Sequence, residues 1–234
     1  MTISAACVTF PGSNCDQDIH RAVGLMGWEL VKLWHENSLD REVDVVFVPG
    51  GFSYGDYLRC GALARFSPAM ASLRQHEARG GLVVGICNGF QILCEAGMLP
   101  GALTRNAGLK FRCLWTHLKV ANADTAFTSA ATAGAVLRVP IAHGEGNYFA
   151  HPDELKRLQD NGQIVFQYCD AAGAVSAESN PNGSISSIAG IQNERGNVLG
   201  MMPHPERAME PILGGEDGRI LFNSLEHALA RAGA

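Results

Sequence analysis

Cys87 is the residue of this sequence whose surroundings point most directly to nucleophilic catalysis. It is the third residue of Gly-Ile-Cys-Asn-Gly at 85–89, which follows an apolar run and precedes a helical pattern. A strand, a sharp turn and a helix in this order are typical of a nucleophile elbow, here with cysteine in place of serine. The glycines leave room in the turn, and the helix N-terminus favours the thiolate. The alternative interpretation is a buried structural cysteine that follows a strand.

A base for this cysteine is predicted in the stretch Met-Met-Pro-His-Pro-Glu at 201–206. The two prolines predict an extended chain, in which side chains two residues apart share a face. Glu206 is therefore expected to orient the imidazole of His204, and His204 to activate Cys87. The alternative is a surface turn that carries ordinary polar residues.

A second histidine competes for the role of base. His143 begins the glycine-rich stretch His-Gly-Glu-Gly, which is typical of an exposed functional loop. Glu145 would lie beside the ring only if Gly144 were extended, and glycine does not enforce that conformation. The remaining histidines lack a comparable acid in a rigid setting and are interpreted as structural or exposed: His20, His35, His76, His117, His151 and His227.

Acyl transfer also needs hydrogen-bond donors for the oxyanion of the tetrahedral intermediate. The stretch Pro-Gly-Gly-Phe at 49–52 ends an apolar run. We expect the backbone N–H groups of Gly51 and Asn88 to be these donors. The alternative is a plain strand-to-loop turn. The stretch 49–52 is not a phosphate loop, because no Gly-Lys-Ser/Thr follows it. No other ATP motif occurs in the sequence.

The elements that must position these residues alternate between strands and helices in the first hundred residues. Strands are expected at 5–10, 29–34, 43–48 and 82–86, and helices after the turn at Asn14, at 61–79 and at 90–96. Continuous apolar runs predict strands buried on both faces. We therefore predict an α/β fold with an open, mostly parallel central sheet and helices on both faces.

The second half of the chain is richer in strands. They are expected at 114–120, 136–141, 164–168, 188–192 and 198–202, and a final helix at 218–232. Nothing resembles a linker or a repeat, so we predict a single domain over residues 1–234.

The composition excludes several classes of partner. Net charge is −5 without a charge run, which argues against nucleic acid or an anionic membrane as the main partner. No apolar stretch approaches the roughly 18 residues of a membrane span, and the first residues lack the basic start of a signal peptide. Seven cysteines without a CxxC pair indicate a reduced, cytoplasmic protein, and no spacing predicts a metal site.

Taken together, these stretches resemble the class I (triad) glutamine amidotransferases. The family motif Gly-x-Cys-x-Gly-x-Gln is matched at 85–91, its His-Pro-Glu at 204–206 and its Pro-Gly-Gly at 49–51. A narrower resemblance, to the glutaminase subunits of phosphoribosylformylglycinamidine synthases, runs from about Ala5 to Leu225. Its motifs lie at 10–16, 51–59, 143–146 and 201–207.

The resemblance implies a flavodoxin-like fold and the hydrolysis of L-glutamine by a Cys-His-Glu triad. It also implies that ammonia passes to a large synthetase subunit, which uses ATP and Mg, in a complex with a small bridging subunit. That complex converts formylglycinamide ribonucleotide to formylglycinamidine ribonucleotide in de novo purine synthesis, and this chain needs no cofactor of its own.

Further roles carry over from the resemblance to single residues. Gln91, Phe52 and Asn106 are expected to contact glutamine. The stretch 53–59 and the loop with His143 and Glu145 are expected to face the synthetase.

Two other functions remain open on the sequence. One is a γ-glutamyl hydrolase or cysteine peptidase on the same fold; Gln91 and the lack of a secretory signal argue against the hydrolase. The other is a non-catalytic, redox-sensing module of flavodoxin-like fold, in which Cys87 would oxidise readily but would not react with a glutamine analogue.

Overall fold

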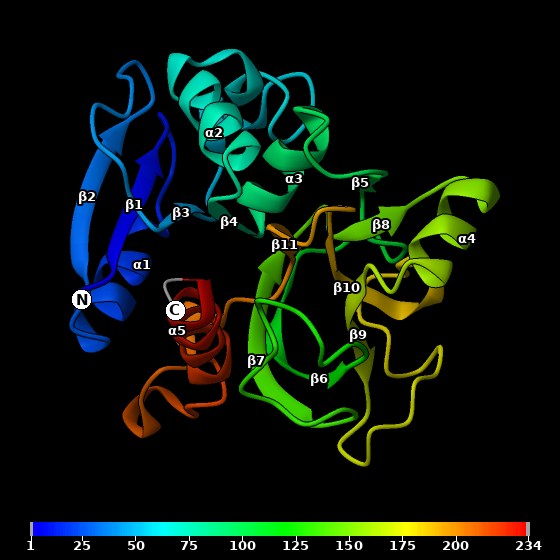
Figure 1. The fold of residues 1–234 in the computed structure, drawn as a ribbon. Coiled ribbons are helices and arrows are strands. Elements are labelled where there is room, and N and C mark those ends of the chain that lie inside the picture. Colours follow the sequence, from blue (N-terminus) through cyan, green and yellow to red (C-terminus); the bar gives the residue numbers. More distant parts are fainter. Residues whose placement is uncertain (1, 233–234) are drawn as a thin grey trace. The chain divides into compact units, whose positions relative to one another are not determined.

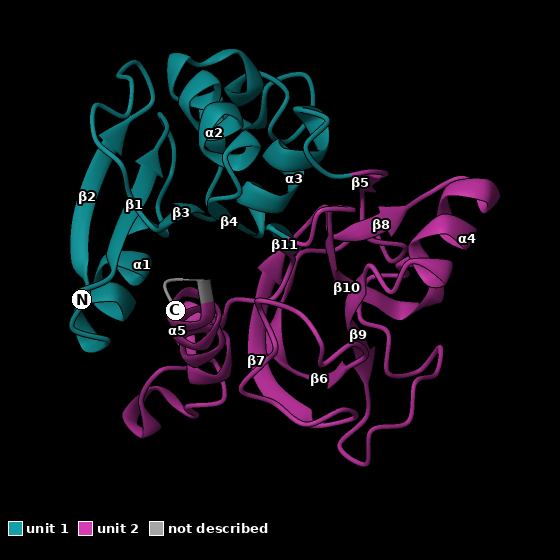
Figure 2. Cartoon of the chain, in the orientation of Figure 1, with its two compact units in different colours: residues 1–99, 197–200 teal, residues 100–196, 201–234 magenta. Residues whose placement is uncertain are grey.

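The computed structural model describes residues 2–232 (Figure 1). The chain forms two compact units, coloured separately in Figure 2. Unit 1 comprises Met1–Leu99 and Asn197–Gly200, and unit 2 comprises Pro100–Gly196 and Met201–Ala234. The single domain over residues 1–234 stays a prediction.

Unit 1 is built on a sheet whose strands run in the order β2-β1-β3-β4-β11. The strands are β1 (Ser4–Thr9), β2 (Glu29–Trp34), β3 (Val45–Val48), β4 (Leu82–Ile86) and β11 (Val198–Met201). The pairs β1–β2, β1–β3 and β3–β4 are parallel. Every residue of β3 and β4 is buried, as expected for strands covered on both faces. The predicted α/β fold with a mostly parallel sheet is confirmed.

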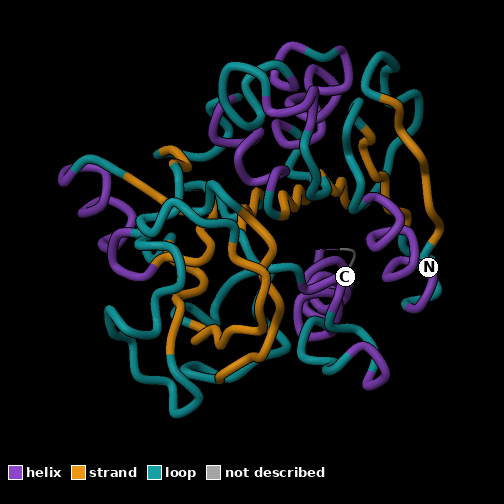
Figure 3. Tube along the Cα trace, turned by 180° about the vertical axis from the view of Figure 1, so that it is seen from behind, coloured by secondary structure: helices purple, strands orange, loops and turns teal. Residues whose placement is uncertain are grey.

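Helices cover both faces of this sheet. They are α1 (Asp16–Leu25), α2 (Pro68–Ala78) and α3 (Asn88–Glu95). α1 lies on one face, whereas α2 and α3 lie on the other, as both views show (Figures 1 and 3). The helix predicted over 61–79 is wrong in its first part, because α2 begins only at Pro68. Proline has no N–H to donate and is favoured at the first helical position. The residues before Pro68 form a loop with a 3₁₀ turn at Ala64–Phe66.

Unit 2 contains the antiparallel part of the fold. Its main strands follow the order β10-β9-β6-β7, and the pairs β10–β9, β9–β6 and β6–β7 are antiparallel. They are β6 (Arg112–Val120), β7 (Val136–His143), β9 (Ile164–Cys169) and β10 (Ile188–Gln192). A separate antiparallel pair joins β5 (Ala102–Thr104) to β8 (Asn147–Phe149). The predicted strand-rich second half is confirmed.

Two helices complete unit 2. The final helix, α5 (Arg219–Ala232), begins one residue later than predicted. The helix α4 (Pro152–Asp160) was not predicted, because Leu158 is its only buried residue and the apolar pattern is weak. No helix among the described residues is long and apolar enough to cross a membrane.

Candidate active site

Cys87 occupies a strained turn between β4 and α3. Its backbone angles are φ 54° and ψ −107°, a region that L-residues rarely adopt. A Cβ on Gly85 would lie 2.8 Å from the carbonyl carbon of Gly89, and a Cβ on Gly89 would strike the carbonyl oxygen of Val48. Any larger residue at position 85 or 89 would collide with backbone atoms, so both positions require glycine. The structure gives Cys87 the geometry of a nucleophile elbow at a helix N-terminus.

The loop after β3 is held against the loop that follows β1. Phe52 donates its N–H to the carbonyl oxygen of Gly12 at 3.0 Å, and Tyr54 donates to Pro11 at 2.6 Å. Gly51 has a φ of 136°, and a Cβ there would lie 2.8 Å from the backbone nitrogen of Asn14. The N–H of Gly51 makes no hydrogen bond within residues 2–232, which leaves this donor available to a ligand.

The side chain of Asn88 links this loop to the helix that follows Cys87. Its Oδ1 accepts the backbone N–H of Ser53 at 3.1 Å, and its Nδ2 donates to Oε1 of Gln91 at 2.8 Å. All three residues are buried. The sequence predicts a role for the backbone of Asn88 alone, so the linking role of this side chain emerges only from the structure.

His204 and Glu206 lie in unit 2 and are in direct contact. Nδ1 of His204 is 2.6 Å from Oε1 of Glu206, and both side chains are buried. The extended chain expected here is wrong, since Pro205–Arg207 form a 3₁₀ turn that brings the carboxylate back to the ring. Because a carboxylate accepts, Nδ1 carries the proton, and Nε2 is the basic nitrogen of the neutral imidazole.

His143 makes a different set of contacts at the end of β7. The amide nitrogen of Asn182 donates to its Nε2 at 3.1 Å. Burial, and to a smaller extent the neighbouring charge of His204, lowers the pKa of His143 to about 3. Glu145 lies 3.7 Å from Arg105 instead. His143 is therefore a neutral, buried imidazole in the same unit as His204, and the exposed loop expected here is wrong, since His143 ends β7.

Asn106 is completely buried and joins two loops of unit 2. Its Nδ2 donates to the carbonyl oxygens of Lys110 at 2.8 Å and His143 at 2.9 Å, while its Oδ1 accepts the N–H of Gly146 at 3.0 Å. Both amide hydrogens are thereby used. The predicted contact of Asn106 with glutamine stays a prediction, and the Asn106 side chain has no further N–H to donate to a ligand.

The residues 53–59, called the rim segment below, project an apolar tip from unit 1. Tyr57 is 75% exposed and Leu58 is 87% exposed, and Leu58 has a positive φ of 68°. The segment is fixed at both ends to α3, at one end through Ser53 and Asn88, and at the other through Arg59, whose Nε lies 2.6 Å from Glu95.

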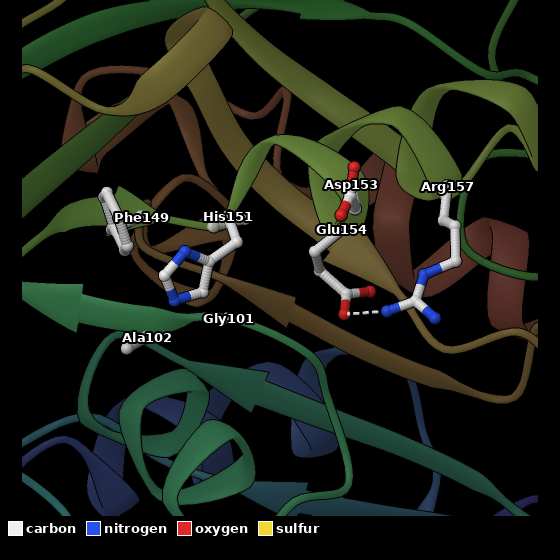
Figure 4. A pocket seen from close by; sticks show the side chains of 8 residues that line it. Gly101, Ala102, Phe149, His151, Asp153, Glu154 and Arg157 are labelled. Carbon is white, nitrogen blue, oxygen red and sulfur yellow. Dashed lines mark hydrogen bonds and ion pairs between the residues drawn. The ribbon is translucent and has the colours of Figure 1, made fainter.

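One pocket of unit 2 lies apart from all of these residues. It has a volume of about 500 Å³ and lies between Phe149 of β8 and the first turns of α4 (Figure 4). His151, Asp153 and Glu154 also line it, and Glu154 is paired with Arg157 at 2.5 Å. None of the predicted site residues lines this pocket. The described residues contain no cluster of three or more metal-ligating side chains.

Comparisons with known proteins agree on the family. The model of the CobB/CobQ-like glutamine amidotransferase domain matches residues 2–214. The chain is 58% identical to a protein of Moorella thermoacetica over 93% of both chains, and 55% identical to one of Salinibacter ruber over 96% of both. Both relatives are named phosphoribosylformylglycinamidine synthase subunit PurQ.

Solved structures are also similar. A chain in the structure of PurLQS from Thermotoga maritima is 43% identical and superposes with a TM-score of 0.88, over 98% of this chain and all of that one. A putative GMP synthase subunit from Thermoplasma acidophilum has a TM-score of 0.65, covers 99% of this chain and 96% of its own, and is 13% identical. The second likeness shows the fold alone. The chain belongs to the CobB/CobQ-like glutamine amidotransferase family.

Proposed function

We propose that this chain is a glutaminase subunit that hydrolyses L-glutamine to glutamate and ammonia, with Cys87 as the nucleophile. The observation that carries the proposal is the strained turn of Cys87. Only glycine fits at positions 85 and 89 on either side of it. Such strain is retained where the surrounding structure fixes a residue for a task. The contact between His204 and Glu206 supports their assignment as base and orienting acid.

The reaction has two stages. His204 takes the thiol proton of Cys87 through Nε2, and the thiolate attacks the side-chain amide carbon of glutamine. The N–H groups of Gly51 and Asn88 stabilise the oxyanion. His204 then protonates the amide nitrogen, and the carbon–nitrogen bond breaks to release ammonia and leave the thioester. Water, deprotonated by His204, hydrolyses the thioester and releases glutamate, which restores the thiol.

Glu206 and Gln91 support these stages without bonding to the reacting carbon. Glu206 accepts the Nδ1 proton of His204 and stabilises the imidazolium that forms after proton transfer. Gln91 and Phe52 are proposed to contact the bound glutamine. Gln91 is buried beside the elbow, whereas Phe52 is 46% exposed at the end of the Gly51 loop.

We further propose that the ammonia serves a large synthetase subunit, held with a small bridging subunit, that uses ATP and Mg to convert formylglycinamide ribonucleotide to formylglycinamidine ribonucleotide. The names of the relatives as synthase subunits support this, as does the PurLQS structure. The rim segment and the loop that follows the buried His143 and carries Glu145 are proposed to face the synthetase. A cytoplasmic location fits seven cysteines that form no disulfide within the described residues.

The variant Cys87→Ala tests the nucleophile. In the assembled complex it should abolish glutamine-dependent synthesis, because no thioester can form, while added ammonia still supports synthesis. Steady-state assays with each nitrogen source measure the two activities. A variant that kept its glutaminase rate would rule out Cys87 as the nucleophile.

Cys94→Ala is the matched control. Cys94 lies in α3, the helix that follows Cys87, but burial raises the pKa of its thiol, so it is not expected to react. The control should keep both activities. After treatment with an electrophilic diazo-ketone analogue of glutamine, mass spectrometry should find the label on Cys87 alone.

A further inference from the structure

The buried amide of Asn88 stands between the two parts of unit 1 that the reaction needs. One is the loop of Gly51, the proposed oxyanion donor, which is tied to Asn88 through the N–H of Ser53. The other is Gln91, the proposed substrate contact, which accepts the Asn88 amide nitrogen at 2.8 Å. Asn88 is 1% exposed, so water does not compete for either bond.

The directions of these bonds fix one another. A backbone N–H can only donate, so the side that Asn88 turns to Ser53 must be its oxygen. The NH₂ group of Asn88 therefore faces Gln91, and Gln91 must answer with its own oxygen. The amide of Gln91 is thereby oriented with its NH₂ group turned away from Asn88. The peptide N–H of Ser53 thus sets the direction of both hydrogen bonds.

We propose that Asn88 is a positioning residue for glutamine hydrolysis, which holds the Gly51 loop in place and orients the Gln91 amide to donate to bound glutamine. The inference rests on the proposed function and deepens it. The planar amide of asparagine presents its acceptor to Ser53 and its donor to Gln91. Aspartate lacks the donor, and alanine lacks both groups.

Two variants separate the two bonds. In Asn88→Asp the carboxylate still accepts from Ser53, but Gln91 must reverse its amide to donate to it. The KM for glutamine should then rise about tenfold, the equivalent of one lost hydrogen bond, with kcat within about threefold of wild type. In Asn88→Ala the Gly51 loop is also released, and kcat should fall about tenfold in addition, less than for the loss of an oxyanion donor itself.

Asn197→Ala is the matched control for the loss of a buried amide. Asn197 lies in the same unit and donates to the carbonyl oxygens of Glu77 at 2.9 Å and Gly81 at 3.1 Å. This variant should lower Tm to a similar extent as Asn88→Ala but leave KM and kcat for glutamine unchanged. All variants are measured in the assembled complex, where ammonia-dependent synthesis should be the same for each.

The outcomes distinguish this proposal from the proposed function. If both Asn88 variants match Asn197→Ala, with a lower Tm and unchanged KM and kcat, the positioning role is overturned, while a dead Cys87→Ala would still uphold the nucleophile. A raised KM in Asn88→Asp together with a lowered kcat in Asn88→Ala supports the proposal. Loss of kcat alone in Asn88→Asp would contradict the orientation of Gln91.

Discussion

His143 is an imidazole whose protonation the fold opposes. Nε2 of the His143 ring accepts a hydrogen bond from Asn182, and the backbone carbonyl oxygen of His143 accepts one from Asn106. Buried amides therefore hold both the ring and the backbone of His143. A Cβ on Gly146 would strike the ring, which shows how closely the loop wraps it. A second positive charge beside His204, the proposed base, is thereby disfavoured.

This enclosure predicts a pH dependence of stability. The pKa of His143 is about 3 in the folded chain against 6.5 when unfolded, so between these values the unfolded state binds the extra proton. The free energy of unfolding should fall as pH drops below about 6.5, and this group contributes about 1.4 kcal/mol per pH unit. In His143→Gln the slope measured by urea unfolding at several pH values should be shallower.

His151→Gln, a change at an exposed histidine, is the control and should keep the wild-type slope. An unchanged slope in His143→Gln would show that His143 takes up its proton in the folded chain as readily as in the unfolded one.

At the level of single residues, local spacing predicts the candidates that act through near neighbours. Cys87 is recognised from adjacent glycines, and His204 from an acid two positions away. The side-chain role of Asn88 cannot be predicted in this way. Its partner Ser53 lies 35 residues away, and only the parallel pairing of β3 and β4 brings their ends together.

At the scale of elements, the elbow depends on backbone contact between α3 and β3. Gly89→Ala would place a methyl group against the carbonyl oxygen of Val48, in a core that cannot relax easily. The free energy of unfolding should decrease by about 1–3 kcal/mol. Denaturant unfolding measures the change.

Gly24→Ala provides the comparison, because a Cβ at this position in α1 meets no atom within 4 Å. Alanine should there stabilise the chain by about 0.5–1 kcal/mol through its higher helix propensity. Equal effects of the two variants would mean that packing at the elbow is not the constraint.

Elements with mostly apolar, buried runs are predicted at their observed bounds, as for β4 and β10. Prediction fails where local signals are weak or conflict. The helix α4 buries one residue, and its mostly polar sequence does not show a core-facing stripe. At His204 the prolines indicate extension, but proline is equally suited to the first position of the 3₁₀ turn that forms.

At the scale of the whole molecule, the proposal that the rim segment faces a synthetase subunit is tested at Leu58, which is 87% exposed. Leu58→Asn should weaken the complex at least about fivefold, because it removes a fully projecting apolar contact. Asparagine tolerates the positive φ of this position, so the fold should be kept. Titration of the labelled chain with its partner subunits measures Kd.

The control is Ile212→Asn in unit 2, where the side chain is as exposed as that of Leu58. It should leave Kd unchanged. If Leu58→Asn binds as tightly as wild type, the synthetase does not use the rim segment.

The position of Asn88 directly before Gly89 also bears on how the chain ages. An asparagine followed by glycine is prone to lose its amide, since the next backbone nitrogen can attack the side-chain carbonyl when the chain is flexible. Here the first turn of α3 and two buried hydrogen bonds hold the amide away from that attack. A chain that stays unfolded should therefore deamidate at this point to a mixture of isoaspartate and aspartate, so folding protects the proposed active site from a slow covalent change.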